Sequence, residues 1–367
     1  MRCPKCSAEI QSEVVVCPFC GAQLAAGPSG PELVIVRTSR LAIAALVLGV
    51  LSVFTVGVLS VPAVILGIVA LSVMDPKGGR VTGHGLATAG IVLGLVGLGL
   101  FILASPLTLA RKRGLATRMV CGTNLSRIGK AMLIYANDYE DGLPRAGGRQ
   151  SVWTGRTMNW KAPTQQEAFG LDPNGYGGEV TVSASLYLLV KYAEVAPKSF
   201  LCIGEDKTKE FVPRKHRAKG LGLTDVWDFG PEPLKHCSYT YHTPYGQYAL
   251  TVEAEPGMAV AADRNPWQAS RWAKGDEEWE LFDPNRATGR HRHGNAPSHH
   301  NDGQNVLFLD SHVEFAKRPT VGINDDNIYT SWDALDISRG VPPTIGSEPA
   351  DKTDSLLVHD GAGTVRK

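Results

Sequence analysis

The sequence predicts a protein of several domains: a small module held by a metal ion, a pair of membrane-spanning helices, and an α+β domain in which a long helix packs on an antiparallel sheet. Closely spaced N-terminal cysteines indicate the first part, and a nearly uncharged stretch from residue 41 indicates the second. For the third part, apolar periodicity after residue 111 indicates the helix, and alternation on both sides of residue 310 indicates a β-hairpin. The length of 367 residues also favours more than one domain.

The N-terminal cysteines form two Cys-x-x-Cys pairs, Cys3 with Cys6 and Cys17 with Cys20. Four thiolates satisfy tetrahedral Zn²⁺ and leave no position for a reactive water, so a structural site is expected. Because so short a segment cannot build its own core, zinc binding would supply most of its folding free energy. Two disulfides and a redox Cys-x-x-Cys are the alternatives, although a redox motif belongs in a βαβ pattern. With Gly21 after the second pair, the segment resembles the zinc ribbons that begin many bacterial membrane proteins.

Charge is distributed very unevenly along the chain. The totals, 37 basic and 36 acidic side chains, argue against a nucleic-acid footprint. Between residues 41 and 110 the charged residues are Asp75, Lys77 and Arg80. We therefore expect the lipid bilayer as a partner of this segment and no nucleic acid as a partner of the protein.

Two apolar runs form the expected membrane domain, Leu41 to Met74 and Leu86 to Ala110, and a basic cluster at 111–113 follows. The second run is about the length of one span, and the first is longer than the roughly 20 residues a span needs. If the first run crosses once, the positive-inside tendency puts both flanking domains in the cytoplasm. If it folds back near Gly57 to Pro62, three spans place the large domain outside. Charge favours two spans, and thus a helical hairpin.

The two runs also resemble a known family. Residues 41–49 and 85–94, joined through Gly83-His-Gly85, resemble a bacterial membrane domain of unknown function, DUF4190. The resemblance implies no activity. The small residues Gly90, Gly94 and Gly97 suit close helix packing in lipid, either within the domain or between copies of the chain.

After the membrane domain, apolar residues recur at steps of three and four over residues 121–139, which predicts one face of a helix. The positions are Cys121, Leu125, Ile128, Met132, Tyr135 and Tyr139. This segment is similar to the helix that follows the membrane span in planctomycete pseudopilin-like proteins (DUF1559-like), which end with a His-x9-Asp-Gly element. The resemblance implies a pilin-like α+β domain.

The matching C-terminal element runs from His300 to Asp310, with Ser311 where that family has glycine. Alternation on both sides of Asp310-Ser311 predicts a β-hairpin, but serine makes a tight type I′ turn less favourable. Residues 238–242 and 260–264 are expected to be further strands. The predicted domains are a zinc ribbon (1–26), a linker (27–40), the membrane domain (41–110), the pilin-like domain (111–336) and a poorly ordered tail (337–367).

Histidines are concentrated near the C-terminal element: His291, His293, His299, His300 and His312, with Asp302 and Asp310 nearby. A second metal or an acid/base pair is one interpretation. The other, which we favour, is that His300 and Asp310 hydrogen-bond to backbone and hold the two ends of the hairpin together. Cys202 and Cys237 would form a disulfide in an extracytoplasmic domain and remain buried thiols otherwise.

No nucleophile elbow, phosphate loop or dinucleotide fingerprint is present in the sequence, so a non-enzymatic role is expected. We expect a membrane-anchored structural or binding protein of the cell envelope, associating with envelope proteins or with itself. Its ribbon would be cytoplasmic, in a multi-pass inner-membrane protein whose large domain, by the pilin analogy, lies in the periplasm. One alternative is a pseudopilin of a type II secretion or type IV pilus-like system, although this chain lacks the glutamate of the pseudopilin processing site. The other is a zinc-dependent hydrolase that uses the histidines near the C-terminal element.

Overall fold

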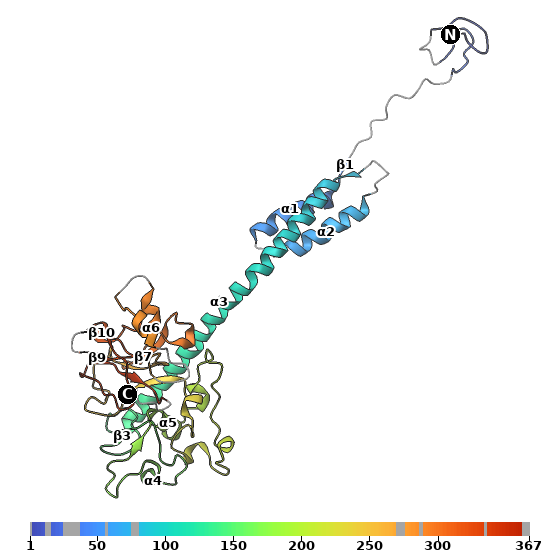
Figure 1. Cartoon of the computed structure of the whole chain (residues 1–367). Coiled ribbons are helices and arrows are strands. Elements are labelled where there is room, and N and C mark those ends of the chain that lie inside the picture. The colour runs from blue at the N-terminus through green and yellow to red at the C-terminus, as the bar shows by residue number, and fades with distance from the viewer. Residues whose placement is uncertain are drawn as a thin grey trace. The chain divides into compact units, whose positions relative to one another are not determined.

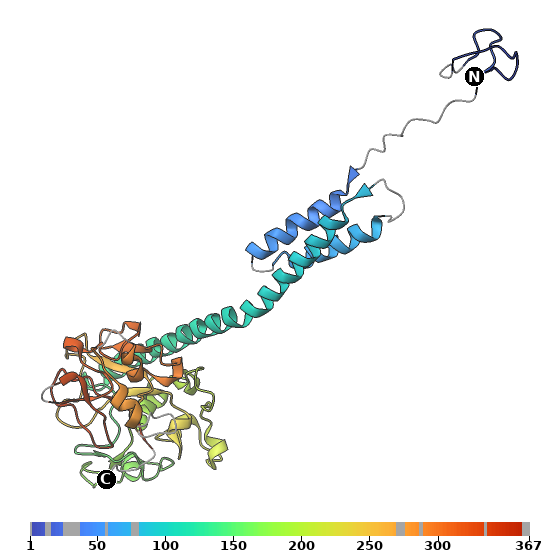
Figure 2. The ribbon, with the colours of Figure 1, turned by 45° about the horizontal axis from the view of Figure 1, so that its top comes forward.

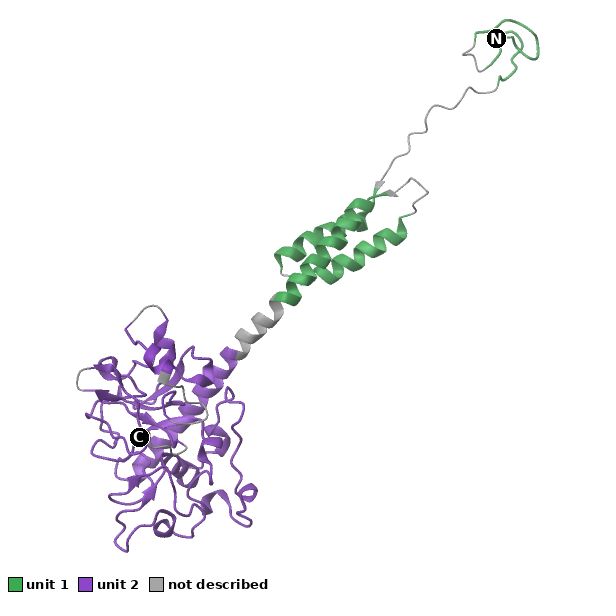
Figure 3. Cartoon of the chain, viewed as in Figure 1, with its two compact units in different colours: residues 1–110 green, residues 111–367 purple. Residues whose placement is uncertain are grey.

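The computed structural model describes residues 2–11, 16–24, 37–55, 58–74, 81–268, 276–285, 289–333 and 336–361. The chain forms two compact units, residues 1–110 and 111–367 (Figure 3). Helix α3 (His84–Asp138) contributes residues to both units (Figure 1). Each unit is described separately below.

Three apolar helices form most of the first unit: α1 (Arg40–Phe54), α2 (Ser60–Val73) and the first part of α3 (Figure 2). The run from Leu41 to Met74 therefore contains two helices, as the fold-back alternative expects, and the number of membrane spans stays a prediction. Pro62 lies in the first turn of α2, where its missing N–H is tolerated. Among the described residues, the segment His84–Leu103 is long and apolar enough to cross a membrane, whereas α1 and α2 are apolar but shorter.

Glycines allow these helices to approach closely. A Cβ at Gly90 of α3 would lie 2.7 Å from the Ala45 carbonyl oxygen of α1, and one at Gly97 would lie 2.5 Å from Ser52 Oγ. On the other side, a Cβ at Gly94 would lie 3.2 Å from the Ser60 carbonyl oxygen of α2. Later residues of α1 thus meet later residues of α3, so these two helices run parallel.

The same contacts fix the direction of α2. A Cβ at Gly67 would lie 3.1 Å from the Ala87 carbonyl oxygen, so α2 runs antiparallel to α3. Strand β1 (Arg37–Thr38) pairs in parallel with β2 (Val81–Thr82), immediately before α1 and α3 begin. Helices α1 and α2 therefore form a hairpin, and α3 begins next to the start of α1.

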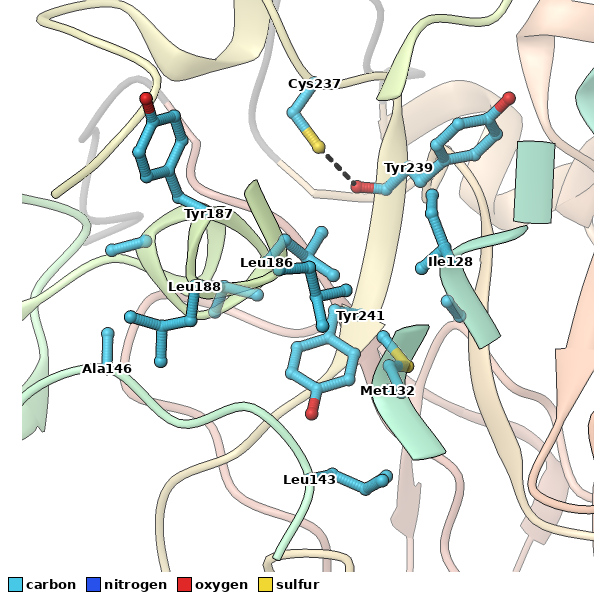
Figure 4. Close-up of a cluster of buried hydrophobic side chains, with 14 of the residues drawn as sticks. Ile128, Met132, Leu143, Ala146, Leu186, Tyr187, Leu188, Cys237, Tyr239 and Tyr241 are labelled. Atoms are coloured by element: carbon cyan, nitrogen blue, oxygen red, sulfur yellow. Dashed lines mark hydrogen bonds between the residues drawn. The ribbon is translucent and has the colours of Figure 1, made fainter. Parts of the chain in front are cut away.

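In the second unit, α3 supplies the predicted apolar stripe. Cys121, Leu125, Ile128 and Met132 are buried, whereas Tyr139 lies just beyond the end of the helix and is 42% exposed. Ile128 and Met132 share a buried core with Leu186 of α5 (Val182–Tyr192) and Tyr241 of β5 (Tyr239–His242), and Figure 4 shows the Met132 side chain beside that of Tyr241. This stripe forms one side of the main core, as the periodicity predicted.

The largest sheet in the described part of the chain is antiparallel, with strand order β11-β5-β6-β7-β8. Its strands are β5 (Tyr239–His242), β6 (Ala259–Asp263), β7 (Gln304–Phe308), β8 (Val313–Ala316) and β11 (Leu357–Val358). Gly129 lets α3 lie against the sheet, because a Cβ there would be 2.6 Å from Leu307 Cδ1. Leu307 joins the core formed with α3, and Val306 and Phe308 belong to a second buried cluster. The α+β class is confirmed.

Short elements complete the second unit. They are β3 (Val152–Trp153) paired in parallel with β4 (Glu179–Val180), α4 (Gln165–Phe169), α6 (Asp276–Leu281), and β9 (Ser331–Asp333) paired with β10 (Asp336–Val341). The 3₁₀ helices are Pro197–Phe200, Pro213–His216, Leu223–Asp225, Pro233–Lys235, Arg290–Gly294, Pro297–His299 and Ile323–Asp325.

The predicted hairpin is present as β7 and β8, with a longer turn than two residues. The Ser311 amide donates to the Phe308 carbonyl at 2.9 Å, and the Phe308 amide donates to the His312 carbonyl at 3.0 Å. Ser311 has φ +73°, the left-handed conformation that favours glycine. The turn therefore spans Leu309 to Ser311, and serine occupies its left-handed position.

The prediction of a poorly ordered tail from residue 337 is wrong for residues 337–361. Leu357 and Val358 pair with β5, and Leu356 to Val358 are fully buried. The Asp360 carboxylate accepts hydrogen bonds from Trp153 Nε1 at 2.9 Å and from the backbone amides of Val182 and Ser183 at 2.9 and 2.8 Å. A buried acid thus anchors the segment to the first turn of α5, where the helix dipole favours negative charge. Residues 362–367 lie outside the described part.

Candidate metal and thiol centres

The four N-terminal cysteines lie together, with sulfur atoms within 4.8 Å of one another. Cys3 Sγ is 3.7 Å from Cys20 Sγ, and Cys6 Sγ is 3.7 Å from Cys17 Sγ. Two sulfurs bound to one tetrahedral zinc at about 2.3 Å lie about 3.8 Å apart, so the spacing fits a shared ion. It is too long for disulfides, whose bond length is about 2.05 Å. The cluster can bind a metal such as zinc, and it is compatible with a zinc ribbon.

Both cysteine pairs are held by the same backbone turn. The Cys3 amide donates to the Ala8 carbonyl, and fourteen positions later the Cys17 amide donates to the Ala22 carbonyl, each at 2.9 Å. Ser7 and Gly21, which follow the pairs, have φ values of +60° and +69°. Backbone amides of Lys5 and Cys6 donate to the Cys3 sulfur and lower the pKa of that thiol to about 6. Amides directed at sulfur favour the thiolate that a metal requires.

A second cluster of candidate ligands lies inside the α+β domain. It combines Cys121 of α3, Cys202 after the 3₁₀ helix Pro197–Phe200, Asp263 at the end of β6 and His299 of the 3₁₀ helix Pro297–His299. One ligand atom from each lies within 4.8 Å of the others. All four residues are buried. Four separate elements of the domain therefore meet at this point.

Within this cluster the contacts divide into two pairs. Cys121 Sγ lies 2.7 Å from Cys202 Sγ. His299 Nε2 lies 2.9 Å from Asp263 Oδ2 and 3.9 Å from Cys202 Sγ. Asp263 Oδ2 also accepts from the Asn305 backbone amide at 2.7 Å and from Asn305 Nδ2 at 3.0 Å. Asp263 Oδ1 is buried and has no hydrogen-bond partner among the described residues.

The environment shifts the pKa of three of these groups. Burial alone would lower the pKa of His299, but hydrogen bonds and charge attraction from Asp263 and Cys121 outweigh it and raise the pKa to about 10. The pKa of Cys121 is lowered to about 6, mainly by its hydrogen bond with Cys202, while that contact and burial raise the pKa of Cys202. The pKa values of the two thiols are therefore shifted in opposite directions, and the higher pKa of His299 favours its protonated form beside Asp263.

The residues predicted for the C-terminal element lie elsewhere. His300 is exposed, with φ +57°, directly after the buried His299. Asp310 accepts hydrogen bonds from the backbone amide and from Nδ1 of His312, at 3.1 and 2.5 Å. Within the described part of the chain, the Asp310 carboxylate therefore hydrogen-bonds across the turn to His312 and not to His300. Contact with His312 also lowers the pKa of Asp310, chiefly through the backbone amide.

In the part of the chain that the structure describes, the histidines of this region do not come together as one candidate metal site. His299 joins the buried cluster, whereas Asp302 pairs with Arg118 at 3.0 Å and contacts Arg292. The Cys237 sulfur contacts the Tyr239 carbonyl oxygen at 3.6 Å, and not the Cys202 sulfur (Figure 4). Sequence reasoning placed Cys121 in an apolar stripe and did not single out Asp263. The sequence feature that could have pointed to this cluster is a cysteine, Cys121, within an otherwise apolar helix face.

The three apolar helices of the first unit lie in a part of the chain that matches a known family model. Residues 41–104 match the domain of unknown function DUF4190. The match confirms the resemblance stated from the sequence, and it attaches no activity to the chain. No curated protein and no solved structure matches this chain.

Proposed function

We propose that this protein is a membrane-anchored, non-enzymatic structural or binding protein of the cell envelope, with a cytoplasmic zinc ribbon and a pilin-like domain on the opposite side of the membrane. Helix α3 carries the proposal. Its segment His84–Leu103 is apolar and long enough to span a bilayer, and its later residues Cys121 to Met132 pack on a sheet. A helix that is apolar in one part and sheet-packed in the next is the arrangement that the pseudopilin resemblance implies.

The directions of the membrane helices support the choice of side. Helices α1 and α2 run in opposite directions, so α3 begins at the same end of the helical bundle as α1. This holds whether or not the α1–α2 hairpin crosses the bilayer completely. Helix α3 then crosses once. Residues before Arg40 and residues after the α3 span would therefore lie on opposite sides. A reducing cytoplasm suits the four thiolates of the ribbon, so the large domain would be extracytoplasmic.

A pair of fusions tests this topology. A phosphatase that is active only outside the cytoplasm is fused after Met74 in one protein and after Lys367 in another. We expect activity from the second fusion alone. Activity from the first fusion alone would mean that residues 41–74 cross once, and it would sink the proposed arrangement.

For the binding role, the second unit offers a shallow groove of about 730 Å³ between α3 and β8. Leu115 and Met119 line it and are 59% and 66% exposed, and the Arg118 guanidinium lies 4.1 Å from the centre of the Phe315 ring at its edge. Exposed apolar side chains beside a cation suit a protein partner.

A photo-crosslinking amino acid at Met119 tests this face in the living cell. We expect one discrete adduct, with an envelope protein or with a second copy of the chain. The same amino acid at Lys130, which is exposed on α3 outside the groove, is the control. Equal adducts at both positions, or none at Met119, would remove the groove as the binding face. A ladder of adducts between copies of this chain would instead favour the pseudopilin alternative.

Zinc is proposed for the ribbon cysteines alone. We expect one equivalent per chain in the purified protein, lost in a Cys3→Ser/Cys6→Ser variant and retained in Cys237→Ser. A second equivalent that persists in the Cys3→Ser/Cys6→Ser variant would favour the zinc-dependent hydrolase alternative.

A further inference from the structure

The two sulfurs of the buried cluster are closer than metal ligands should be. Their separation, 2.7 Å, is 1.0 Å shorter than the 3.7 Å between paired sulfurs in the ribbon. Tetrahedral zinc would require about 3.8 Å. Closing the remaining gap to a disulfide bond of about 2.05 Å needs a movement of less than about 1 Å.

The neighbouring polar groups already satisfy one another. Asp263 Oδ2 accepts two hydrogen bonds from Asn305, and it lies 2.9 Å from His299 Nε2. A metal would need these same oxygen and nitrogen atoms, so the ion pair and the ion would compete. Asp263 Oδ1 is the one candidate ligand atom without a partner among the described residues, and a single oxygen does not make a site.

The segments that carry the sulfurs are also fixed beside each other by other contacts. Asn124, one turn after Cys121, donates from Nδ2 to the Leu201 carbonyl at 3.0 Å and to Tyr239 Oη at 3.3 Å. A Cβ at Gly204 would lie 3.2 Å from Thr117 Cγ2, so the segment just after Cys202 lies against the Thr117 side chain, one turn before Cys121 in α3. The sulfurs therefore face each other through the surrounding packing.

We propose that Cys121 and Cys202 form a structural disulfide that fastens α3 to the body of the α+β domain. The bond would join positions 81 residues apart in the sequence. It replaces the Cys202–Cys237 pairing considered from the sequence, because Cys237 Sγ faces a backbone carbonyl. A disulfide persists in an oxidising compartment, so this inference rests on the extracytoplasmic location of the domain proposed above.

The oxidation is a thiol–disulfide exchange with an envelope protein or small molecule that itself carries a disulfide. One cysteine thiolate attacks that disulfide and forms a mixed disulfide, which releases one thiolate of the donor. The thiolate of the second cysteine then attacks the mixed disulfide, and the donor leaves as a dithiol. Two electrons pass from the cysteine pair to the donor, and the two cysteine protons end on the donor sulfurs. Because both cysteines are buried in the folded domain, the exchange takes place during folding.

Peptide mapping of the full-length protein from its membrane tests the bond. Free thiols are alkylated under denaturing conditions without reductant, and the digest is analysed by mass spectrometry. We expect the peptides of Cys121 and Cys202 to be joined, with a mass two hydrogens below their sum, and Cys237 to be alkylated. The Cys237→Ser variant should keep the link, and Cys121→Ser should leave Cys202 alkylated.

Three results would overturn the inference: alkylation of both Cys121 and Cys202 in the native chain, a Cys202–Cys237 link, or a zinc equivalent that is lost specifically in Cys121→Ser. The fusion after Lys367 decides the location separately. An active fusion with free Cys121 and Cys202 would defeat the disulfide and leave the proposed function standing. An inactive fusion would defeat the location, whatever the state of the thiols.

Discussion

Arg264 donates hydrogen bonds from Nε and Nη2 to the two carboxylate oxygens of Glu205, at 2.9 and 2.8 Å. The side chains are 1% and 2% exposed. Arg264 directly follows Asp263, so this buried ion pair holds β6 next to the cysteine cluster. Nη2 also donates to the Cys237 carbonyl at 2.9 Å, which links the pair to the segment before β5.

Replacing Glu205 by glutamine should be strongly destabilising, because it leaves the guanidinium charge buried without a counterion. We expect a loss of about 3–5 kcal/mol in the free energy of unfolding, measured by urea titration. Glu232→Gln is the control, since its pair with Lys235 is 57% and 44% exposed and should contribute less than about 1 kcal/mol. Similar losses in the two variants would contradict a special role for the buried pair.

Gly90→Ala should separate α1 from α3. The added Cβ would lie 2.6 to 2.8 Å from backbone atoms of Ala45 and Leu46, which cannot rotate away. We expect a loss of about 1–3 kcal/mol, measured as earlier loss of helical signal in a titration with denaturing detergent. Gly99→Ala meets nothing within 4 Å and should be neutral or slightly stabilising. If both variants behave alike, the close approach is not essential to the bundle.

Asp228 should make stability depend on pH. Its carboxylate is buried and accepts hydrogen bonds from Thr181 Oγ1 at 2.6 Å and Ser183 Oγ at 2.9 Å. Burial, and then the charge of Asp360, raise the pKa of Asp228 from 3.8 to about 7. The folded state therefore holds a proton that the unfolded state releases, and this contribution is present below about pH 4 and lost as the pH rises to about 7.

An Asp228→Asn variant lacks that titration. We expect the unfolding free energy of the native chain, relative to the variant, to fall by a few kcal/mol between pH 4 and pH 8, on the order that such a pKa difference implies. Urea titrations of both proteins at pH 4, 6 and 8 give the comparison. Groups that do not interact with Asp228 cancel in this comparison, whereas loss of the Asp228 charge also lowers the pKa of Asp360. Parallel curves would show that Asp228 keeps an ordinary pKa.

Ser311→Gly should stabilise the hairpin. Serine holds φ +73° in the turn, a conformation that glycine adopts without a Cβ clash. We expect a gain of about 0.5–1 kcal/mol from relief of this strain, reduced by the greater freedom of glycine in the unfolded chain. Ser311→Ala keeps the Cβ and should bring no gain. A thermal melt of the three proteins decides the order, and equal midpoints for glycine and alanine would exclude strain at this position.

Local pattern was enough to predict several elements. The steps of three and four from Cys121 to Tyr135 predicted the buried face of α3, and alternation around Asp310 predicted β7 and β8. These signals depend on residues that are close in sequence. The left-handed φ at Ser311 was also foreseeable, because the pseudopilin-like sequences that this segment resembles have glycine there.

Long-range partners could not be predicted in the same way. The contact between Cys121 and Cys202 joins positions 81 residues apart, and periodicity carries no information about it. The C-terminal segment was judged by its prolines and sparse apolar residues, but Leu356 to Val358 and the single acid Asp360 are sufficient to fix it. The close approaches of α2 and α1 to α3 at Gly67 and Gly90 likewise join residues that are far apart in the sequence.

In the proposed topology, the hairpin of α1 and α2 is neutral to orientation. If α1 and α2 cross the bilayer in opposite directions, they cancel, and a chain without residues 41–74 would keep the ribbon and the α+β domain on the same sides as before. Loss of α2 alone would place the two domains on the same side of the membrane. Gains or losses of such hairpins during evolution would leave the sidedness of the flanking domains intact. The ribbon and the α+β domain could thus diversify independently while a single span, His84–Leu103, keeps them in separate compartments.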